Sequence, residues 1–337
     1  MFEGHGDDGY KHSRALKADF STNVWYGGAP AGLKEHLFAQ WEKIQRYPEV
    51  LSESLTAKIA AHHGLPQGTV LVTNGSTESI YLIAQAFNKH RTAIAVPAFA
   101  EYEDACLLHG HHTRFIPWNE VEAATLEDTD VLFICNPNNP TGAVIHDLTS
   151  FVKRNINVLF VVDEAFIEFT YEVTSLVSDV RHCANLIVMR SMTKVYAIPG
   201  LRLGYIVAQE HLLQRLTRQK LPWSVNSMAI EAGHFIFDHY TELELPLRQL
   251  LSDKEEFVRQ LAGTPLVVLP SHTHFFLCQT TGGTAAGLKR FLLDEADLLI
   301  RDAGNFRGLT ASSLRLATLS PAKNQLLINA LHQWKPM

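Results

Sequence analysis

The sequence predicts an α/β fold, in which a mostly parallel sheet carries helices on both faces and is joined to a second, smaller α/β domain. Five short apolar runs indicate buried strands, at residues 93–96, 131–134, 158–162, 186–189 and 204–207. Helical patterns occupy several of the gaps between these runs, and strands that alternate with helices are typical of a parallel sheet. A chain of 337 residues with 46% hydrophobic residues is long enough to bury the cores of one large and one smaller domain.

Charge and hydropathy exclude several classes of partner. The net charge is −6 and no basic stripe offsets it, which argues against nucleic acid or an anionic membrane as a partner. No stretch approaches the roughly 20 apolar residues of a membrane helix. The first residues have neither the basic nor the apolar region of a signal peptide. We therefore expect a cytoplasmic protein that captures any anionic substrate by local positive charge.

The cysteine and histidine spacings do not predict a metal site. Cys106, Cys135, Cys183 and Cys278 are widely separated, which indicates reduced thiols in or near the core. The cluster His109-Gly-His-His112 lacks acidic or cysteine partners at ligand spacing, so we interpret it as a solvated loop.

The first candidate binding segment is Thr73-Asn-Gly-Ser-Thr-Glu-Ser-Ile80, where a glycine-containing turn with hydroxyl groups opens a helical pattern. Free backbone N–H groups and the helix dipole bind phosphate at such an N-terminus, which makes Gly75, Ser76 and Thr77 candidates. An ordinary capping box explains the same residues equally well.

The second segment, Asn136-Pro-Asn-Asn-Pro-Thr-Gly142, follows the apolar run that begins at Val131. Proline, asparagine and glycine all favour turns, so the segment by itself predicts only a tight loop. Two prolines and three asparagines at the carboxyl end of a strand nevertheless favour a rigid loop whose amides point into a cleft. Asn139 is the candidate among them.

The third segment places Asp163 directly after the apolar run at residues 158–162, and so at the carboxyl end of a parallel strand. Open α/β sheets bind their ligands at that end. A helix N-cap or a surface ion pair is the simpler explanation for an isolated Asp-Glu pair in this position.

The fourth segment, residues 190–205, has Lys194 among hydroxyl groups and an arginine downstream. Lysine has a flexible stem and a pKa that shifts readily, which suits it to covalent bonding with a carbonyl group. Ser191 and Arg202 are residue types that hold a phosphate. These are the needs of pyridoxal phosphate (PLP), and Asp163 would keep its ring nitrogen protonated so that the ring acts as an electron sink. A lone Ser-x-x-Lys is weak evidence, so the prediction depends on all four segments together.

In this order and spacing, the four segments resemble the fold-type I, aminotransferase-like family of PLP enzymes over nearly the whole chain. The resemblance implies a PLP-dependent transferase fold of type I, with a mostly parallel sheet of the seven-stranded type. It also implies a large PLP-binding domain at residues 39–234 and a small domain formed by residues 1–38 and 235–337. The expected assembly is a homodimer with shared active sites.

The resemblance also implies a role for each matching residue. Lys194 would bond covalently to PLP and act as the proton-transfer base, Asp163 would pair with the ring nitrogen, and Asn139 would contact the phenolic oxygen. The remaining cofactor contacts would come from Gly75, Ser76, Thr77, Ser191 and Arg202, from Tyr102 as the ring-stacking aromatic residue, and from Tyr47 of the partner subunit.

One position departs from the family pattern. Most relatives have a tyrosine that donates a hydrogen bond to the phenolic oxygen, and this chain has Phe166 there. The cofactor would lose that donor, which could raise the pKa of the linkage to Lys194.

Within the family, several segments resemble decarboxylases of L-threonine O-3-phosphate, which make aminopropanol phosphate for the cobalamin side chain. They include Asp163-Glu-Ala-Phe-Ile-Glu-Phe169 and Leu299-Ile-Arg-Asp-Ala-Gly-Asn305. Histidinol-phosphate aminotransferases share the scaffold and the substrate phosphate, and they are the near alternative. In both cases the substrate would be a small phosphorylated amino acid or amine.

The substrate contacts that this resemblance implies are Asn23, Asn139 and Arg315, of which Arg315 would bind the carboxylate. The decarboxylases often have a second arginine four residues after the carboxylate arginine, but this chain has Leu319. Other groups must then bind the substrate phosphate, and the candidates are His5, Arg301 and Arg307.

Two other classes of protein fit less well. A non-catalytic PLP-binding regulatory module would carry an added basic helix-turn-helix segment, and this chain starts almost directly with family-like sequence. A dinucleotide-binding oxidoreductase would show Gly-x-Gly-x-x-Gly after a strand, and none of the predicted strands is followed by that motif.

Overall fold

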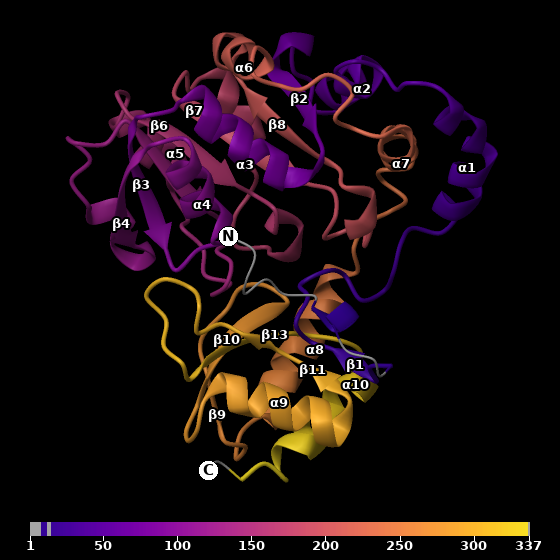
Figure 1. Cartoon of the computed structure of the whole chain (residues 1–337), viewed down its shortest axis with the longest axis vertical. Helices are drawn as coiled ribbons and strands as arrows, with labels where there is room; N and C mark the ends of the chain where they lie inside the picture. The colour runs from indigo at the N-terminus through magenta and orange to yellow at the C-terminus, as the bar shows by residue number, and fades with distance from the viewer. Residues whose placement is uncertain (1–7, 12–14, 336–337) are drawn as a thin grey trace.

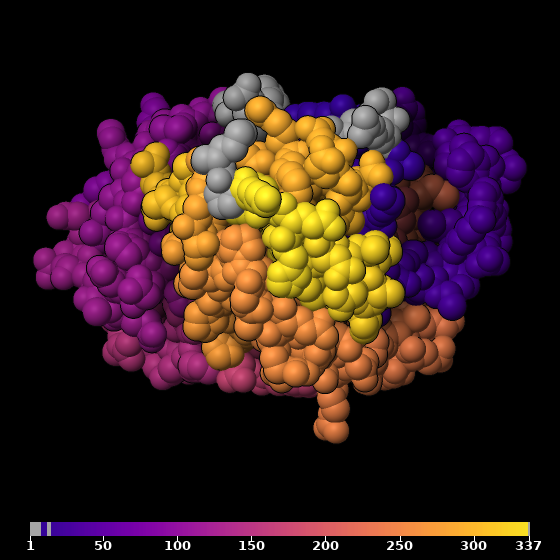
Figure 2. Space-filling view, turned by 90° about the horizontal axis from the view of Figure 1, so that it is seen from below, coloured from indigo at the N-terminus to yellow at the C-terminus, as the bar shows by residue number. Residues whose placement is uncertain are grey.

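The computed structural model describes residues 8–11 and 15–335 and shows two lobes (Figure 1). The upper lobe contains one large sheet with its helices, and the lower lobe contains two smaller sheets. Seen from below, orange and yellow C-terminal residues cover the centre of the molecule, with residues from the first half of the chain at both sides (Figure 2). The lower lobe is therefore built largely from the C-terminal part of the chain.

The large sheet has seven strands in the order β2-β8-β7-β6-β5-β3-β4. Strand β8 runs antiparallel to both of its neighbours and the other pairs are parallel. This arrangement confirms the predicted α/β fold with a mostly parallel, seven-stranded sheet. The strands are β2 Val70–Thr73, β3 Arg91–Val96, β4 His112–Pro117, β5 Val131–Cys135, β6 Leu159–Asp163, β7 Leu186–Ser191 and β8 Gly204–Ala208.

The two strands that the sequence pattern missed, β2 and β4, lie at opposite edges of this sheet. Strand β2 has only four residues, and β4 alternates exposed and half-buried residues over most of its length. Strands that are buried on both faces read as continuous apolar runs, whereas β4 faces solvent and does not; β2 is buried, and its short length accounts for it. The five predicted runs accordingly match the inner strands β3, β5, β6, β7 and β8.

The described residues form ten α-helices, several of which begin at a side-chain cap. Asp147, Asn226 and Thr284 each accept the backbone N–H three residues on, at 3.0, 2.8 and 3.0 Å. Each bond satisfies one N–H group that a helix start leaves without a partner inside the helix. The helices are α1 Leu33–Ala39, α2 Glu53–His62, α3 Gly75–Ala86, α4 Glu101–Leu108, α5 Leu148–Arg154, α6 Glu210–Thr217, α7 Ser227–Asp238, α8 Leu247–Gln260, α9 Ala285–Ala296 and α10 Pro321–Leu331.

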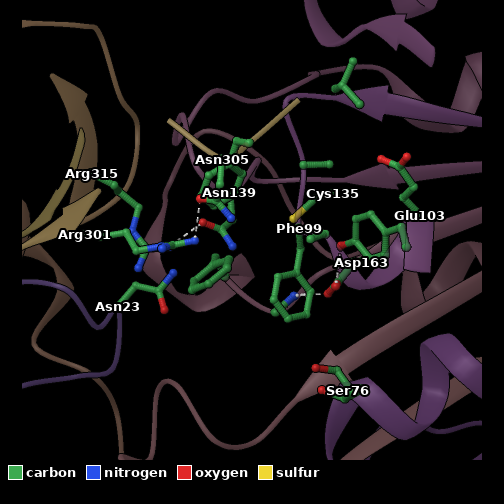
Figure 3. Close-up of a pocket in the computed structure, with 18 of the residues that line it drawn as sticks. Asn23, Ser76, Phe99, Glu103, Cys135, Asn139, Asp163, Arg301, Asn305 and Arg315 are labelled. Atoms are coloured by element: carbon green, nitrogen blue, oxygen red, sulfur yellow. Dashed lines mark hydrogen bonds between the residues drawn. The ribbon is translucent and has the colours of Figure 1, made fainter. Parts of the chain in front are cut away.

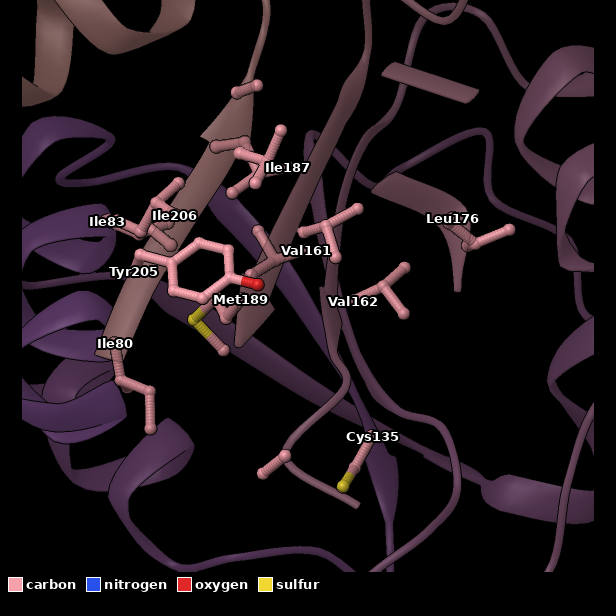
Figure 4. Close-up of a cluster of buried hydrophobic side chains, with 14 of the residues drawn as sticks. Ile80, Ile83, Cys135, Val161, Val162, Leu176, Ile187, Met189, Tyr205 and Ile206 are labelled. Atoms are coloured by element: carbon pink, nitrogen blue, oxygen red, sulfur yellow. The ribbon is translucent and has the colours of Figure 1, made fainter. Parts of the chain in front are cut away.

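The main hydrophobic core lies between the large sheet and its helices. Figure 4 shows Ile80 and Ile83 of α3 on one side and Tyr205, Ile206 and Met189 of the sheet on the other. These side chains are at most 2% exposed, so α3 is held firmly against the sheet. Its N-terminus is thereby fixed at the edge where the parallel strands end.

The lower lobe has a second core and takes chain from both ends of the sequence. Its larger sheet is antiparallel, in the order β12-β13-β10-β9, and β1 near the N-terminus pairs with β11 in parallel. Leu33 of α1 packs in the upper core, and Phe257 of α8 packs in the lower one. The domain boundaries at residues 39 and 234 stay a prediction. The strands are β1 Ala18–Asp19, β9 Leu266–Val268, β10 Phe275–Thr280, β11 Leu298–Leu299, β12 Arg301–Asp302 and β13 Ser313–Ala317.

The structure also shows where the four cysteines and the histidine cluster lie. The four cysteines are buried and free, in agreement with the predicted core thiols. The predicted solvated loop at residues 109–112 is wrong for His111, which is buried. Its Nδ1 is 2.6 Å from the Thr92 hydroxyl and its Nε2 is 2.8 Å from the Ala84 carbonyl oxygen, so it ties α3 to β3. Within the described residues, no helix is long and apolar enough to cross a membrane.

Candidate active site

A cavity of about 570 Å³ lies between the two lobes, at the carboxyl ends of the inner parallel strands (Figure 3). Strands β5 and β6 pair so that Cys135 lies opposite Asp163, and the next strand, β7, ends at Ser191. Because these strands end at the same edge of the sheet, the residues that follow them meet around one space. The lower lobe contributes Arg301 and Arg315 from β12 and β13.

Asp163 is a buried carboxylate at the upper-lobe end of the cavity. Its Oδ1 accepts a hydrogen bond from the Ala165 backbone N–H at 2.9 Å, and its Oδ2 accepts one from the Tyr102 hydroxyl at 2.7 Å. Burial raises the pKa of Asp163, and these two bonds and the nearby Lys194 ammonium oppose the rise. The two donors fix the carboxylate and leave it acceptor capacity for a further donor.

The geometry does not favour Tyr102 as the residue that stacks on a ligand ring. Its own ring stacks on Phe133, with centroids 5.4 Å apart, and its side chain is 1% exposed. Both rings line the cavity, and that of Phe99, which stands at 90° to that of Tyr102, is the more exposed of the two. Phe99 is therefore better placed for stacking, and the structure gives Tyr102 a different contact, with Asp163.

The N-terminus of α3 forms a narrow cradle at the cavity. Gly75 has a φ of +76°, and a Cβ at this position would lie 2.4 Å from a guanidinium nitrogen of Arg202. At Gly204 of the neighbouring β8, a Cβ would lie 2.9 Å from the Ser76 backbone nitrogen. Glycine at both positions allows this close approach. With Thr77 also lining the cavity, hydroxyls, a guanidinium and helix N–H groups converge on one place, which suits an anion.

The structure shows one half of a capping box in the same segment, since the side chain of the N-cap residue Asn74 makes no capping bond. Glu78 accepts the backbone N–H of Asn74 at 2.6 Å, as a capping carboxylate does. Lys220 donates to the same carboxylate at 2.9 Å. The two interpretations are compatible, because Glu78 satisfies the N–H before the helix and leaves the first N–H groups within it to the cavity.

Lys194 lies in the loop after β7 and lines the cavity. Its backbone carbonyl accepts the N–H of Trp25 at 2.9 Å, which joins this loop to the N-terminal segment. The hydroxyls of Ser191 and Thr193 are 2.9 Å apart. The loop thus carries a lysine close in sequence to two hydroxyl groups, on a backbone that is bonded to the N-terminal segment.

Arg315 is a buried arginine at the lower-lobe end of the cavity. Its Nη1 donates to Oδ1 of Asn139 and its Nη2 to the Ser21 carbonyl, both at 2.6 Å. Among the described residues, its Nε has no hydrogen-bond partner, and neither has Nδ2 of the buried Asn23. Burial, and then the neighbouring Arg301, lower the pKa of Arg315 to about 9. A buried guanidinium with two unsatisfied donors near it is suited to an anionic group.

His274 supports this end of the cavity and was not predicted from the sequence. Its Nε2 donates to the Asn23 carbonyl oxygen at 3.2 Å. Burial lowers the pKa of His274 to about 3, so the ring stays neutral beside Arg315. It holds the segment around Asn23 against the start of β10 without adding a positive charge.

The predicted phosphate candidates differ in where they lie. Arg301 and Arg307 both line the cavity, and His5 lies outside the described residues. Leu319 packs in the lower core and does not reach the cavity. The loop that carries Arg301 and Arg307 also brings Asn305 to the cavity.

Tyr47 does not lie in the cavity of the single chain. Its side chain is 84% exposed, and its ring centroid is 5.1 Å from that of Trp223. Phe166, by contrast, lines the cavity and packs edge-on against Phe275, with centroids 4.8 Å apart.

The sequence analysis missed several lining or supporting residues, among them Phe99, Thr193, His274 and Asn305. Thr193 and Asn305 stood inside segments that it had already selected, and Phe99 stands three residues before the candidate Tyr102. His274 follows no motif, because its contact with Asn23 joins residues 251 positions apart.

Comparisons with known proteins find relatives over nearly the whole chain. A threonine-phosphate decarboxylase of Salmonella typhimurium is 34% identical over 328 residues, which cover 93% of this chain and 90% of that protein. The crystal structure of L-threonine-O-3-phosphate decarboxylase from Porphyromonas gingivalis has a TM-score of 0.92 and 39% identity, over 94% of this chain and 98% of that one. The histidinol-phosphate aminotransferase from Clostridium acetobutylicum has a TM-score of 0.86 and 28% identity, over 94% and 98%.

The match to a whole family is equally extensive. Residues 17–331 match the family described as aminotransferase class I and II. This confirms the predicted resemblance and the prediction that the chain is an enzyme. The chain therefore belongs to the aminotransferase class I and II family, whose members are typically PLP-dependent enzymes.

Proposed function

We propose that this enzyme binds PLP and decarboxylates L-threonine O-3-phosphate to aminopropanol phosphate, a precursor of the cobalamin side chain. The observation that carries this proposal is the pair Arg301 and Arg315, which lie opposite each other on β12 and β13 and both line the cavity. Like charges directly opposite each other destabilise a sheet. A substrate with both a carboxylate and a phosphate would neutralise the two guanidinium groups together.

The residues at the upper-lobe end suit PLP. Asp163 offers a fixed, buried carboxylate for the ring nitrogen, and Lys194 offers an amine for the covalent link. When bound, PLP supplies an electron sink for the bond that breaks at the substrate Cα. Donors for its phosphate are available from Ser76, Thr77 and Arg202 at the α3 cradle, and Ser191, which pairs with Gly204 behind the cavity lining, would add a further hydroxyl.

The orientation of the substrate carboxylate decides the reaction. Arg315 and Asn139 are hydrogen-bonded to each other, and we infer that they would orient the substrate carboxylate for loss as CO2. Lys194 would then return a proton from Nζ to Cα. If the same two residues instead turned the Cα–H bond toward Lys194, this lysine would remove the Cα proton, and transamination would follow.

Product analysis with threonine phosphate tests this proposal. We expect CO2 release without 2-oxoglutarate, measured as one CO2 per aminopropanol phosphate formed. Unphosphorylated threonine should react much more slowly, because it lacks the charge-assisted contacts of the phosphate. A requirement for an amino acceptor, with a 2-oxo product and no CO2, would show that the decarboxylase assignment is wrong.

Transamination of histidinol phosphate is a second candidate function. The observation that favours it is Leu319, which packs in the lower core at the position where the decarboxylases often have a second arginine. Histidinol phosphate carries a phosphate but no carboxylate, so it needs fewer cationic contacts at one time. Turnover of histidinol phosphate with 2-oxoglutarate distinguishes the two reactions.

We also propose a two-fold dimer in which Tyr47 of each subunit completes the site of the other. The exposure of Tyr47, Trp41 and Trp223, at 84, 51 and 47%, supports this, because large aromatic side chains gathered on a surface often mark an interface. Mixed Tyr47→Ala and Lys194→Ala subunits should recover up to about one quarter of the sites. A fully active monomer in sedimentation would contradict the dimer.

A further inference from the structure

One arginine joins the loop after β12 to the upper lobe. Arg307 donates from Nε to Oε2 of Glu103 at 3.0 Å and from Nη2 to Oε1 at 2.6 Å. Its guanidinium also lies 3.9 Å from the ring centroid of Phe115. Glu103 belongs to α4 and Phe115 to β4, so both contacts cross from the lower lobe to the upper one.

We propose that Glu103 and Arg307 are a positioning pair that holds this loop closed over the substrate end of the cavity; the identity of the substrate rests on the proposed function. The loop begins beside Arg301, whose Nη2 donates to Oδ1 of Asn305 at 3.0 Å. The Arg301 guanidinium also lies 5.2 Å from the ring centroid of Phe306. Because Arg301, Asn305 and Arg307 all line the cavity, a displacement of Arg307 would move the other polar groups away from the substrate.

The ion pair between Glu103 and Arg307 has the strength expected of a contact that must break when the loop opens. The side chains of Arg307 and Glu103 are 49 and 27% exposed. Ion pairs with this exposure contribute little and are screened by salt, although two-point geometry and the contact with Phe115 strengthen this one. A loop held in this way stays closed most of the time, yet it opens for substrate binding and product release.

Direct phosphate binding by Arg307 is the competing explanation, and the two make opposite predictions for Glu103. If Arg307 contacts the phosphate itself, Glu103 competes with the substrate for it, so Glu103→Gln should leave KM unchanged or lower it. If Arg307 positions the loop, Glu103→Gln should raise KM as Arg307→Gln does, because either change breaks the same contact.

Hydrogen exchange and steady-state kinetics of the PLP-loaded protein test the proposal. Without substrate, Arg307→Gln and Glu103→Gln should each raise amide exchange at residues 303–309 by roughly two- to tenfold. With threonine phosphate, both should raise KM by a similar factor and leave kcat within about twofold. The charge swap Glu103→Arg with Arg307→Glu should restore part of the protection, which a general loss of structure would not allow.

Arg91 provides a matched control. It bonds Asp130 at two points, at 3.2 and 2.7 Å, and its side chain is 50% exposed, but it lies at the start of β3 and not at the cavity. Arg91→Gln should change neither the loop exchange nor KM. Unchanged exchange in both loop variants, unchanged KM in both, or a KM increase confined to Arg307→Gln contradicts the proposal. The exchange measurement uses no substrate, so it remains valid if the decarboxylase assignment fails.

Discussion

The two ends of the cavity are built in different ways (Figure 3). At the upper-lobe end, Asp163 and Ser191 are the last residues of two neighbouring parallel strands and are at most 5% exposed. At the lower-lobe end, the loop that carries Asn305 and Arg307 depends on side-chain contacts, and Arg307 is 49% exposed. Backbone register fixes the first end and also places Arg301 and Arg315 at the second, whereas side chains that can be displaced hold the loop with Asn305 and Arg307. We infer that the reaction chemistry is held rigidly, while the choice of substrate depends on a region that can adapt.

The largest effect should come from the upper-lobe end, with Lys194→Ala. We expect the loss of the covalent link to PLP and a fall in kcat of about 100- to 10,000-fold, because no other amine takes over the proton transfer. Borohydride reduction followed by peptide mapping measures the link directly. The wild-type adduct should be found on Lys194 and should disappear in the variant.

Lys153, an exposed lysine of α5 on the upper lobe, serves as the control for this experiment. Lys153→Ala should leave both the adduct and the rate unchanged. An adduct that persists in Lys194→Ala on another lysine would overturn the site assignment.

The difference between the two ends also explains how much could be predicted from sequence. The inner strands are buried on both faces, so their apolar runs and the residues that end them, such as Asp163, are visible in the sequence. Edge strand β4 is not visible in the sequence, because its exposed and half-buried residues alternate and leave no apolar run. The contact between Arg307 and Glu103 joins residues 204 positions apart, and no local pattern indicates such a pairing.

Tyr102 illustrates a second limit of sequence reasoning. Phe99 and Tyr102 stand in one short segment, and either ring could in principle stack on a cofactor. Both rings line the cavity, but Tyr102 of α4 is buried by stacking on Phe133 of β5, whereas Phe99 is partly exposed. The sequence therefore does not determine which ring is free to stack on a ligand.

At the lower-lobe end, Arg315→Ala should have the next largest effect. Loss of a charge-assisted carboxylate contact costs roughly 1.5–3 kcal/mol, which is about ten- to a hundredfold in kcat/KM. Arg315→Lys should recover only part of this, because lysine cannot keep the bonds to Asn139 and Ser21 and bind the carboxylate as well. Steady-state kinetics with threonine phosphate measures the effect, and thermal unfolding monitors the fold. A loss below about threefold in Arg315→Ala would mean that the carboxylate is bound elsewhere.

The smallest effect should come from Tyr102→Phe, which keeps an aromatic ring and removes one hydrogen bond. The Tyr102 pKa is raised well above its usual range, mainly by burial, so its hydroxyl stays protonated and donates to Asp163. That bond lowers the pKa of Asp163 against the effect of burial, so its loss should raise this pKa further. Asp163 is anionic only above its pKa, and its hold on a protonated ring nitrogen is therefore lost as the pH falls. In the variant this loss should begin at a higher pH.

PLP titration of the apoenzyme between about pH 5.5 and 8 measures this shift, with a few-fold weaker affinity expected at the acid end and little change at the alkaline end. Tyr205→Phe is the matched control, because Tyr205 is equally buried but its hydroxyl lies 3.0 Å from His63. An unchanged pH dependence in Tyr102→Phe would contradict the role given to this hydrogen bond. If Tyr102 served as the stacking ring, Phe99→Ala should be silent, whereas our assignment expects it to weaken PLP binding at every pH, because a stacking contact does not titrate.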